Sequence, residues 1–452
     1  MSAVSSPPAP GDLRGALLRA PRGSSPPRLV SIGLLGHGRV GRALCELLAA
    51  RGGDIARRHG LDLRIATVLV RDATAPRDSL PPAARLSGCA ESFLAGEHDG
   101  VVEVLGGLEP AGTLVAALLA RGTPVVTANK LLLAERGLAL ASAAAASGAA
   151  LRYEASVAAG VPLFSVIERS LRTTRISGIA AVLNGTSNFV LSRIARGGAS
   201  FGDALAEAQR LGLAEPDATL DVRGADAAHK LRVLALAACG RELPARRVDV
   251  RGIESVRAPD CARAALLGHR IKPVAWADLS GPPDGWVAPA AVPEGHPLAA
   301  VEGAQSGVLL TGDTVADLFL AGPGAGPTPT AASIVDDLIA VATGGAAPPL
   351  ASESPAETPF PETPPSRSRW LLAFAPTRDR PGTEEVLAFL AREGIAFRQL
   401  REIDEPAGHV VAGVTCDAAS ESVGRAGATL RTVGAVREWS AFRVLPSSRP
   451  VA

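Results

Sequence analysis

The chain has 452 residues, 47% of them hydrophobic, so it is long enough for two or three domains with hydrophobic cores. A net charge of +1 and an aromatic content of 3% do not fit a nucleic-acid-binding or membrane-surface protein, and we expect neither partner. The five cysteines have no paired CxxC spacing, which argues against a zinc site and for a reducing compartment.

The N-terminal segment, residues 1–28, is rich in Pro, Ser, Gly and Arg and has no unbroken apolar stretch of the kind found in signal peptides. No later run is long enough to span a bilayer. We therefore expect a disordered tail on a cytoplasmic protein.

Strands alternate with helices over the first third of the chain. The expected strands are 29–35, 65–70, 101–105 and 124–127, and the expected helices are 40–51 and 111–120. This alternation predicts an α/β domain of the Rossmann type, with a doubly wound parallel sheet, over residues 29–151.

The rest of the chain divides into two parts, separated by a region whose residues follow no helical or strand period. Residues 152–321 mix short strands with a long amphipathic helix, 225–239, which predicts a separate α+β domain. Residues 346–368 are rich in Pro, Ser, Glu and Thr, which is typical of a linker. The last part, 369–446, is expected to form a small α+β module with strands at 370–374 and 409–415 and a helix at 384–392.

Three residue types are so rare in this chain that their positions are informative. Arginine is the default cation, because only three of the 46 Lys+Arg residues are lysines. A lysine can release a proton once it is desolvated, whereas arginine cannot near neutral pH. We therefore take the surviving residues as candidates for function, although chance clustering is the alternative. They are Lys130, Lys230, Lys272, Asn129, Asn184, Asn188 and Tyr153.

The glycine motif Gly36-His37-Gly38-Arg39-Val40-Gly41 directly follows the first expected strand and opens a helix. Its glycines allow a tight turn and close approach of the backbone to a pyrophosphate, while the helix N-terminus supplies N–H donors. Arg71, followed by Asp72, stands where NAD-binding proteins carry an acidic residue. A clamp on a 2′-phosphate would favour NADP, and a solvated surface cation is the alternative.

Three further motifs lie at turns. Thr127-Ala128-Asn129-Lys130 ends a strand at the edge where doubly wound sheets bind ligands, although it could also be a simple helix cap. Tyr153-Glu154-Ala155-Ser156-Val157 and Asn184-Gly185-Thr186-Ser187-Asn188 contain small residues that let backbone groups approach a ligand or a hard cation. Taken alone, both could be ordinary turns.

The strongest signal for chemistry lies between Glu215 and Lys230. Asp226 and Lys230 are four residues apart on the expected helix and so share one face, and Glu215 and Asp221 precede that face. Carboxylates beside one lysine can hold a substrate ammonium group and tune a proton donor. For Asp226 and Lys230 alone, a surface salt bridge would be the simpler interpretation.

Together these motifs resemble the homoserine dehydrogenase family. The resemblance rests on TANK at 127–130, YEASV at 153–157, NGTSN at 184–188 and DAAHK at 226–230, in this order after the glycine motif. The segments 324–326 and 329–331 resemble the part with which that family completes its nucleotide domain, to about residue 345. Ala218 and Ala159 stand where the family usually has proline and glycine.

The resemblance implies reversible, NAD(P)-dependent reduction of L-aspartate 4-semialdehyde to L-homoserine, on the route to threonine and methionine. It implies Lys230 as proton donor, oriented by Asp226, with Lys130 near the reacting centre. The implied substrate-binding residues are Gly185, Thr186, Glu215, Asp221, Asp226 and Lys230. The implied cofactor-binding residues are Gly36, Gly38, Arg39, Val40, Gly41, Arg71, Gly106, Thr127, Lys130 and Gly326.

Similar proteins also bind a structural sodium ion and form dimers through the substrate domain. The implied sodium site is Glu154, Val157, Ala159 and Val161. The C-terminal module, with Asp379-Arg380-Pro381-Gly382, resembles an ACT domain, and threonine would then be an effector. The alternatives are another NAD(P)-dependent amino-acid dehydrogenase and a non-catalytic NADP-binding regulator, neither of which requires the constellation from Glu215 to Lys230.

Overall fold

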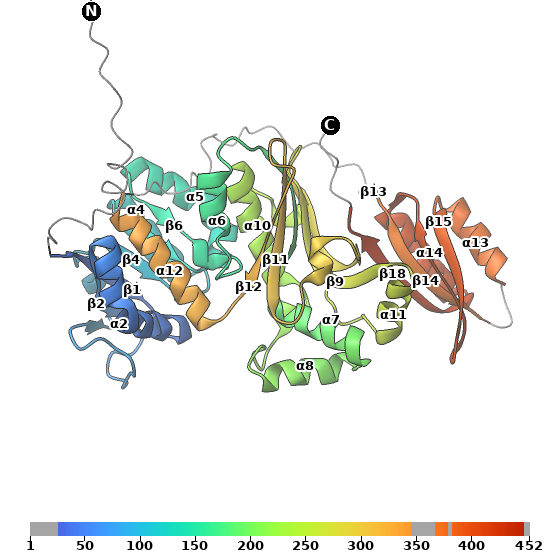
Figure 1. Cartoon of the computed structure of the whole chain (residues 1–452), viewed down its shortest axis with the longest axis horizontal. Coiled ribbons are helices and arrows are strands. Elements are labelled where there is room, and N and C mark those ends of the chain that lie inside the picture. The colour runs from blue at the N-terminus through green and yellow to red at the C-terminus, as the bar shows by residue number, and fades with distance from the viewer. Residues whose placement is uncertain (1–25, 345–366, 378–381, 447–452) are drawn as a thin grey trace, which may run out of the picture.

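The computed structural model describes residues 26–344, 367–377 and 382–446 (Figure 1). Most of the expected N-terminal tail, most of the expected linker and three of the four residues of the Asp379–Gly382 motif lie outside the described residues, while Arg28, expected in the tail, begins the first strand. Within the described ranges, no helix combines the length and apolar character needed to cross a membrane.

The first domain is built on a parallel sheet of six strands in the order β3-β2-β1-β4-β5-β6. This is the doubly wound arrangement predicted from the alternating pattern, and the α/β class is confirmed. The strands are β1 (Arg28–Leu35), β2 (Leu61–Leu69), β3 (Arg85–Ser87), β4 (Gly100–Glu103), β5 (Val125–Thr127) and β6 (Leu151–Arg152).

Helices cover both faces of this sheet, which explains why its strands are hydrophobic on both sides (Figure 1). One face packs against α2 and α12, and the other against α4 and α5. Helix α12 comes from the far end of the second domain and brings Ile334 and Leu338 into the core of the first. The helices are α2 (Arg39–His59), α3 (Ala90–Leu94), α4 (Ala111–Ala120), α5 (Lys130–Ser147) and α12 (Pro327–Ala342).

Two boundaries differ from the expected ones by four residues or more. Helix α2 continues past Arg51 through two glycines and ends only at Gly60, whose φ of 68° is left-handed. The helix therefore stops where the backbone conformation requires glycine. Strand β2 begins at Leu61, four residues earlier than expected, because it pairs with β1 from Arg28 onward.

The second sheet is mixed and joins the other two parts of the molecule (Figure 1). Its order is β12-β11-β7-β9-β10-β18-β14-β16-β15, and β8 also pairs with β10. The strands of the second domain are β7 (Ile176–Val182), β8 (Val248–Val250), β9 (His269–Asp278), β10 (Asp284–Pro293), β11 (Gln305–Gly312) and β12 (Asp317–Pro323).

The helix expected at 225–239 is α10 (Ala225–Cys239), whose Leu231 and Leu234 pack against β9. It also contacts α5 of the first domain, so it lies between the two domains. The remaining helices of this part are α6 (Leu163–Ser170), α7 (Gly185–Gly197), α8 (Phe201–Arg210), α9 (Thr219–Val222) and α11 (Ala258–Leu266), with short 3-10 turns η1 (Glu154–Ser156), η2 (Ala245–Arg247) and η3 (Pro297–Ala300).

The C-terminal module has the chain order βαββαβ, and its four long strands lie in the order β18-β14-β16-β15. A further short pair, β13 and β17, lies beside it. The elements are β13 (Arg367–Ser368), β14 (Trp370–Pro376), α13 (Thr383–Arg392), β15 (Phe397–Glu405), β16 (Gly408–Thr415), β17 (Ala418–Ala419), α14 (Ser420–Thr432) and β18 (Val436–Val444).

Strand β18 attaches this module to the second domain by pairing in parallel with β10 at Ala290 and Ala291. Arg443 of β18 lies 2.9 Å from Asp249 of β8 and is flanked by the rings of Trp286 and Trp370. The module is therefore a continuation of the central sheet.

Candidate active site

The site is centred on Asp226, in the first turn of α10 where the first and second domains meet. Its Oδ2 lies 2.8 Å from Nζ of Lys230, one turn further along α10, and its Oδ1 lies 3.0 Å from Nζ of Lys130. Lys130 is the first residue of α5 and follows β5 at the carboxyl edge of the parallel sheet. One buried carboxylate thus joins a lysine from each domain.

The charges in this cluster compensate one another. Burial by itself raises the pKa of Asp226, but the ammonium groups of Lys230 and Lys130 outweigh it and hold this pKa well below its usual range. In return, Asp226 raises the pKa of Lys130. The side chain of Lys230 is 10% exposed and that of Lys130 is 39% exposed, so Lys130 is the one that faces the open side.

Asn184 organises the cluster from the second domain. As the N-cap of α7, its Oδ1 accepts a hydrogen bond from the backbone N–H of Ser187 at 2.8 Å. Its Nδ2 donates to Asp221 at 2.7 Å and to Asp226 at 2.8 Å. Lys230 also donates to the carbonyl of Leu183 at 2.8 Å. The motif at 184–188 therefore fixes both carboxylates, and Leu183 just before it fixes the lysine.

The glycine motif forms a cradle at the N-terminus of α2. Gly36 has a φ of 99°, and a Cβ on Gly41 would lie 2.6 Å from the carbonyl oxygen of Gly36. Gly38 precedes the helix without a side-chain cap, and no atom lies within 4 Å of where its Cβ would be. The first-turn N–H groups are therefore open to an anion such as a pyrophosphate.

Glu103, at the end of β4, was not predicted as part of the site. It accepts hydrogen bonds from Thr127 Oγ1 at 2.5 Å and from the backbone N–H groups of Leu105 and Gly106 at 2.8 and 3.2 Å. Burial raises its pKa. Asn129 caps α5 and donates to the carbonyl of Gly107 at 2.7 Å. The sequence signal that could have identified Glu103 is its position as a lone carboxylate at the end of an apolar strand.

Arg71 follows β2 and is exposed, as expected of a residue that faces a ligand or solvent. Asp72 beside it accepts hydrogen bonds from the N–H and hydroxyl of Thr74 at 2.8 and 2.6 Å. Arg77 donates to two carbonyls of the same turn. Burial, followed by the charges of Arg77 and Arg42, lowers the pKa of His37 in the glycine motif. Cations therefore gather beside this motif.

Glu215 lies apart from the other predicted substrate residues. It pairs with Arg39 of the glycine motif at 3.3 Å, and both side chains are 69% exposed. Thr186 donates to the carbonyl of Leu213 at 2.8 Å and so holds the segment before Glu215 against α7. The structure thus joins Asp221, Asp226 and the two lysines and places Glu215 opposite the nucleotide domain.

The predicted cation loop lies between β6 and α6. The two carboxylate oxygens of Glu154 accept hydrogen bonds from the N–H groups of Phe164 and Ser165 at 3.0 and 2.8 Å. Ala158 has a φ of 46°, rare for a residue with a side chain, and bends the loop between Glu154 and α6. No group of three or more His, Cys, Asp or Glu side chains suited to a metal occurs in the described part of the chain.

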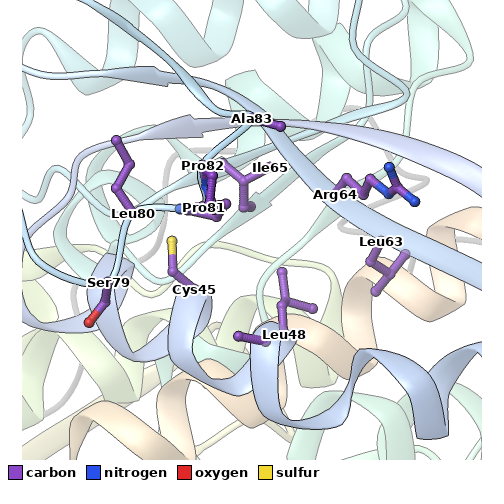
Figure 2. A pocket seen from close by; sticks show the side chains of 11 residues that line it. Cys45, Leu48, Leu63, Arg64, Ile65, Ser79, Leu80, Pro81, Pro82 and Ala83 are labelled. Atoms are coloured by element: carbon purple, nitrogen blue, oxygen red, sulfur yellow. The ribbon is translucent and has the colours of Figure 1, made fainter.

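A cavity of about 350 Å³ lies elsewhere in the first domain, between α2, the first half of β2 and the loop Ser79–Ala83 (Figure 2). Its wall is mostly apolar, with the thiol of Cys45 among the side chains shown. None of its lining residues belongs to the predicted site. The cavity is therefore not the candidate active site.

Known proteins match this chain along most of its length. Family models for "Homoserine dehydrogenase, NAD binding domain" and "Homoserine dehydrogenase" match residues 36–154 and 162–339. A homoserine dehydrogenase of Corynebacterium glutamicum is 34% identical over 391 residues, covering 84% of this chain and 87% of that protein. The chain belongs to the homoserine dehydrogenase family. The homoserine dehydrogenase of a Synechocystis species is 38% identical over 69% of this chain and 72% of its own length.

Solved structures of homoserine dehydrogenases have the same fold. The enzyme from Thiobacillus denitrificans superposes with a TM-score of 0.81 at 33% identity, covering 92% of this chain and 98% of that one. A hyperthermophilic archaeal homoserine dehydrogenase in complex with NADPH has a TM-score of 0.61 at 26% identity, covering 70% and 98%. As a homoserine dehydrogenase family member, the chain is an NAD(P)-dependent oxidoreductase that acts on a CH–OH group.

Proposed function

We propose that Lys230 is the proton donor in the reduction of L-aspartate 4-semialdehyde to L-homoserine, the reaction of this family. The bound nicotinamide cofactor supplies the hydride. As the aldehyde carbon is reduced, negative charge develops on its oxygen, and Lys230 Nζ transfers a proton to it. In the reverse direction, neutral Lys230 accepts the proton from the hydroxyl group.

The observation that carries this proposal is the buried Asp226 with one lysine from each domain, at 2.8 and 3.0 Å. Asp226 and the carbonyl of Leu183 orient Lys230. Lys130, more exposed, would stabilise charge at the reacting oxygen or on the cofactor side. A site that only bound a nucleotide would not need this cluster between the domains.

The test is oxidation of L-homoserine, followed as reduced cofactor, by the whole protein and by Lys230→Ala. We expect turnover to fall by about 10²–10⁴-fold in the variant. Cofactor binding, measured by quenching of protein fluorescence, should be retained. Near-normal turnover in Lys230→Ala would remove Lys230 from the mechanism, and loss of cofactor binding would indicate misfolding.

The substrate's amino-acid end would be held by Asp221 and Glu215, with Gly185 and Thr186 at the start of α7 beside them. Burial raises the pKa of Asp221, and a substrate ammonium group would favour its ionised form. Glu215 of the second domain pairs with Arg39 of the first, and both side chains are exposed. Substrate binding would therefore compete with this exposed pair.

The cradle at residues 36–41 fits the pyrophosphate of a nicotinamide dinucleotide, because Gly38 leaves open space beside the uncapped N-terminus of α2. Gly106 and Thr127 at the sheet edge, and Gly326 at the start of α12, would complete this site. We infer a preference for NADP from Arg71. The carboxylate of Asp72, the alternative partner for a ribose, is already bonded to Thr74. Arg71→Ala should weaken NADP binding more than NAD binding, and equal weakening would reject this role.

A structural sodium ion at Glu154, Val157, Ala159 and Val161 would have ligands that are mainly backbone carbonyls, the oxygen donors that hard cations prefer. Its support is an excess of buried carboxylates near the loop. Arg152 lies 3.4 Å from Glu168 and 3.7 Å from Asp337, and the charge of Glu154 adds to burial in raising the pKa of Asp337. A bound cation would offset this excess.

We also infer that the C-terminal module is an ACT-like sensor of a small amino acid such as threonine. The support is its βαββαβ order and its continuity with the central sheet. Inhibition of homoserine oxidation by L-threonine, but not by D-threonine, would support this role, and no response would reject it.

A homodimer through the second domain is part of the same proposal. Its support is β12, a partly exposed strand at the outer edge of the second sheet, because such an edge can pair with another chain. Light scattering of the whole protein measures the mass in solution, and a monomer would reject the dimer.

A further inference from the structure

Lys272 is the one lysine that the catalytic cluster does not include. It lies in the middle of β9 and is 3% exposed. Its Nζ donates to the carbonyl of Val301 at 2.6 Å and lies 3.3 Å from Glu302. Burial lowers its pKa, so holding an ammonium group here has a cost. A chain that otherwise uses arginine keeps a lysine at this buried position.

The partner of Lys272 is the loop 301–304, which joins η3 to β11. Helix α7 holds the same loop from the other side. Asn188 Nδ2 donates to the carbonyls of Val301 and Gly303 at 3.1 and 2.9 Å. Arg196, also on α7, lies 3.0 Å from Glu302. The loop is therefore fixed between β9 and α7.

This loop lies directly against the first residue of α7. A Cβ on Gly185 would lie 2.7 Å from the carbonyl oxygen of Ala304, closer than ordinary contact. The preceding residue, Asn184, donates hydrogen bonds to Asp221 and Asp226. The loop therefore packs closely against the start of α7, next to the residue that orients both carboxylates.

We propose that Lys272 is a positioning residue for the amino-acid substrate, acting through the loop 301–304 on the start of α7. It does not touch the reacting atoms. It holds the Val301 carbonyl so that the Ala304 carbonyl supports Gly185 and Asn184. The inference rests on the proposed function, because it assigns the start of α7 to the substrate pocket.

The test is Lys272→Met, which keeps most of the side-chain length and removes the ammonium group. We expect the KM for L-homoserine to rise about tenfold, or 1.4 kcal/mol. The KM for the cofactor, and the cofactor Kd measured by fluorescence quenching, should change less than about twofold. The matched control is Arg270→Met, which removes an exposed cation two residues away on the same strand and leaves the contacts of Lys272 with the loop in place, and its KM for homoserine should stay near that of the wild type.

Gly185→Ala keeps the inference testable if Lys272→Met does not fold, because it moves the same contact from the other side. It should raise the KM for homoserine while leaving the cofactor Kd unchanged. An unchanged KM for homoserine in folded Lys272→Met, or equal rises for homoserine and cofactor, would overturn the role of Lys272. So would an unchanged KM in Gly185→Ala. Failure of the proposed function would instead appear in the wild type, as cofactor binding without homoserine oxidation.

Discussion

The cluster of Asp226, Lys230 and Lys130 and the junction between α12 and η1 each bury an aspartate, and the pKa values of the two aspartates shift in opposite directions. Asp226 is 7% exposed and Asp337 is 5% exposed. Two lysines approach Asp226 and hold its pKa well below the usual range. Asp337 has one arginine at 3.7 Å, which it shares with Glu168, and burial raises its pKa to about 7. The number of nearby cations, more than the burial, decides the charge of each aspartate.

The largest expected effect is on turnover. It comes from variants that remove proton donation by Lys230 and either keep or remove its positive charge. Lys230→Arg keeps a cation beside Asp226 but cannot exchange a proton near neutral pH, so turnover should fall at least about 100-fold. Lys230→Met should lose turnover to a similar extent and also lose thermal stability, because Asp226 then keeps only Lys130. Steady-state kinetics and thermal unfolding of both variants measure the two effects. Lys230→Arg with nearly full turnover would contradict proton donation.

The next effect concerns Asp337 and the pH dependence of stability. An unfolded aspartate has a pKa of about 3.9, so between pH 4 and 7 the folded state binds the extra proton and the unfolding free energy falls as pH rises. The fall is at most about 4 kcal/mol for the roughly three-unit difference. Asp337→Asn removes this group and still accepts the hydrogen bond from Glu154 N–H. Denaturant unfolding at several pH values should show a flatter profile in the variant, and parallel profiles would contradict the assignment.

Asp226 should make the unfolding free energy depend on pH in the opposite direction from Asp337. Because its folded pKa is lowered, its contribution is fully present above the unfolded pKa and is lost as pH falls below about 4. The Asp226→Asn variant should therefore lose less stability than the wild type on acidification over that range.

A bound cation would bring positive charge to the junction between α12 and η1, as the two lysines do beside Asp226. Replacing choline chloride by sodium chloride at equal ionic strength should raise the Tm by a few degrees, because binding to the folded state stabilises it. Glu154→Gln should abolish the difference between the two salts. Equal Tm values in both salts for the wild type would argue against a sodium site there.

The smallest effect is expected for the exposed pair of Arg39 and Glu215. Both side chains are 69% exposed, so solvent screens their attraction. Arg39→Gln should change the unfolding free energy by less than about 0.5 kcal/mol in denaturant titrations. A larger loss would show that the pair contributes more to closing the two domains than its exposure indicates.

The spacing of residues along one helix predicted the pair of Asp226 and Lys230, but not the contact of Asp226 with Lys130. Asp226 and Lys230 were expected on one face because residues four apart on a helix are neighbours, and their side chains lie 2.8 Å apart. The edge position of Lys130 followed from the strand before it. Its contact with Asp226 depends on how two domains pack, which no local pattern encodes.

Residues distant in sequence account for what was not predicted. Asp337 accepts a hydrogen bond from Glu154, 183 positions earlier, and Glu103 organises a turn and a neighbouring strand. Each lies in an apolar segment whose pattern indicates only burial.

In the terminal module, β15, α14 and β18 were not predicted, because β15 is largely exposed and β18 alternates weakly. The pairing of β18 with β10 joins elements far apart in the chain.

The edge of β10 is shared by two strands from different parts of the chain. Strand β8 pairs with its first half at 285–287, and β18 pairs with its second half at 290–291. Removing the C-terminal module would therefore uncover backbone donors and acceptors beside Ala290, Ala291 and Val292, all of which are fully buried. Such an edge is a template for self-association. A truncated enzyme would have to protect this edge in another way to avoid aggregation.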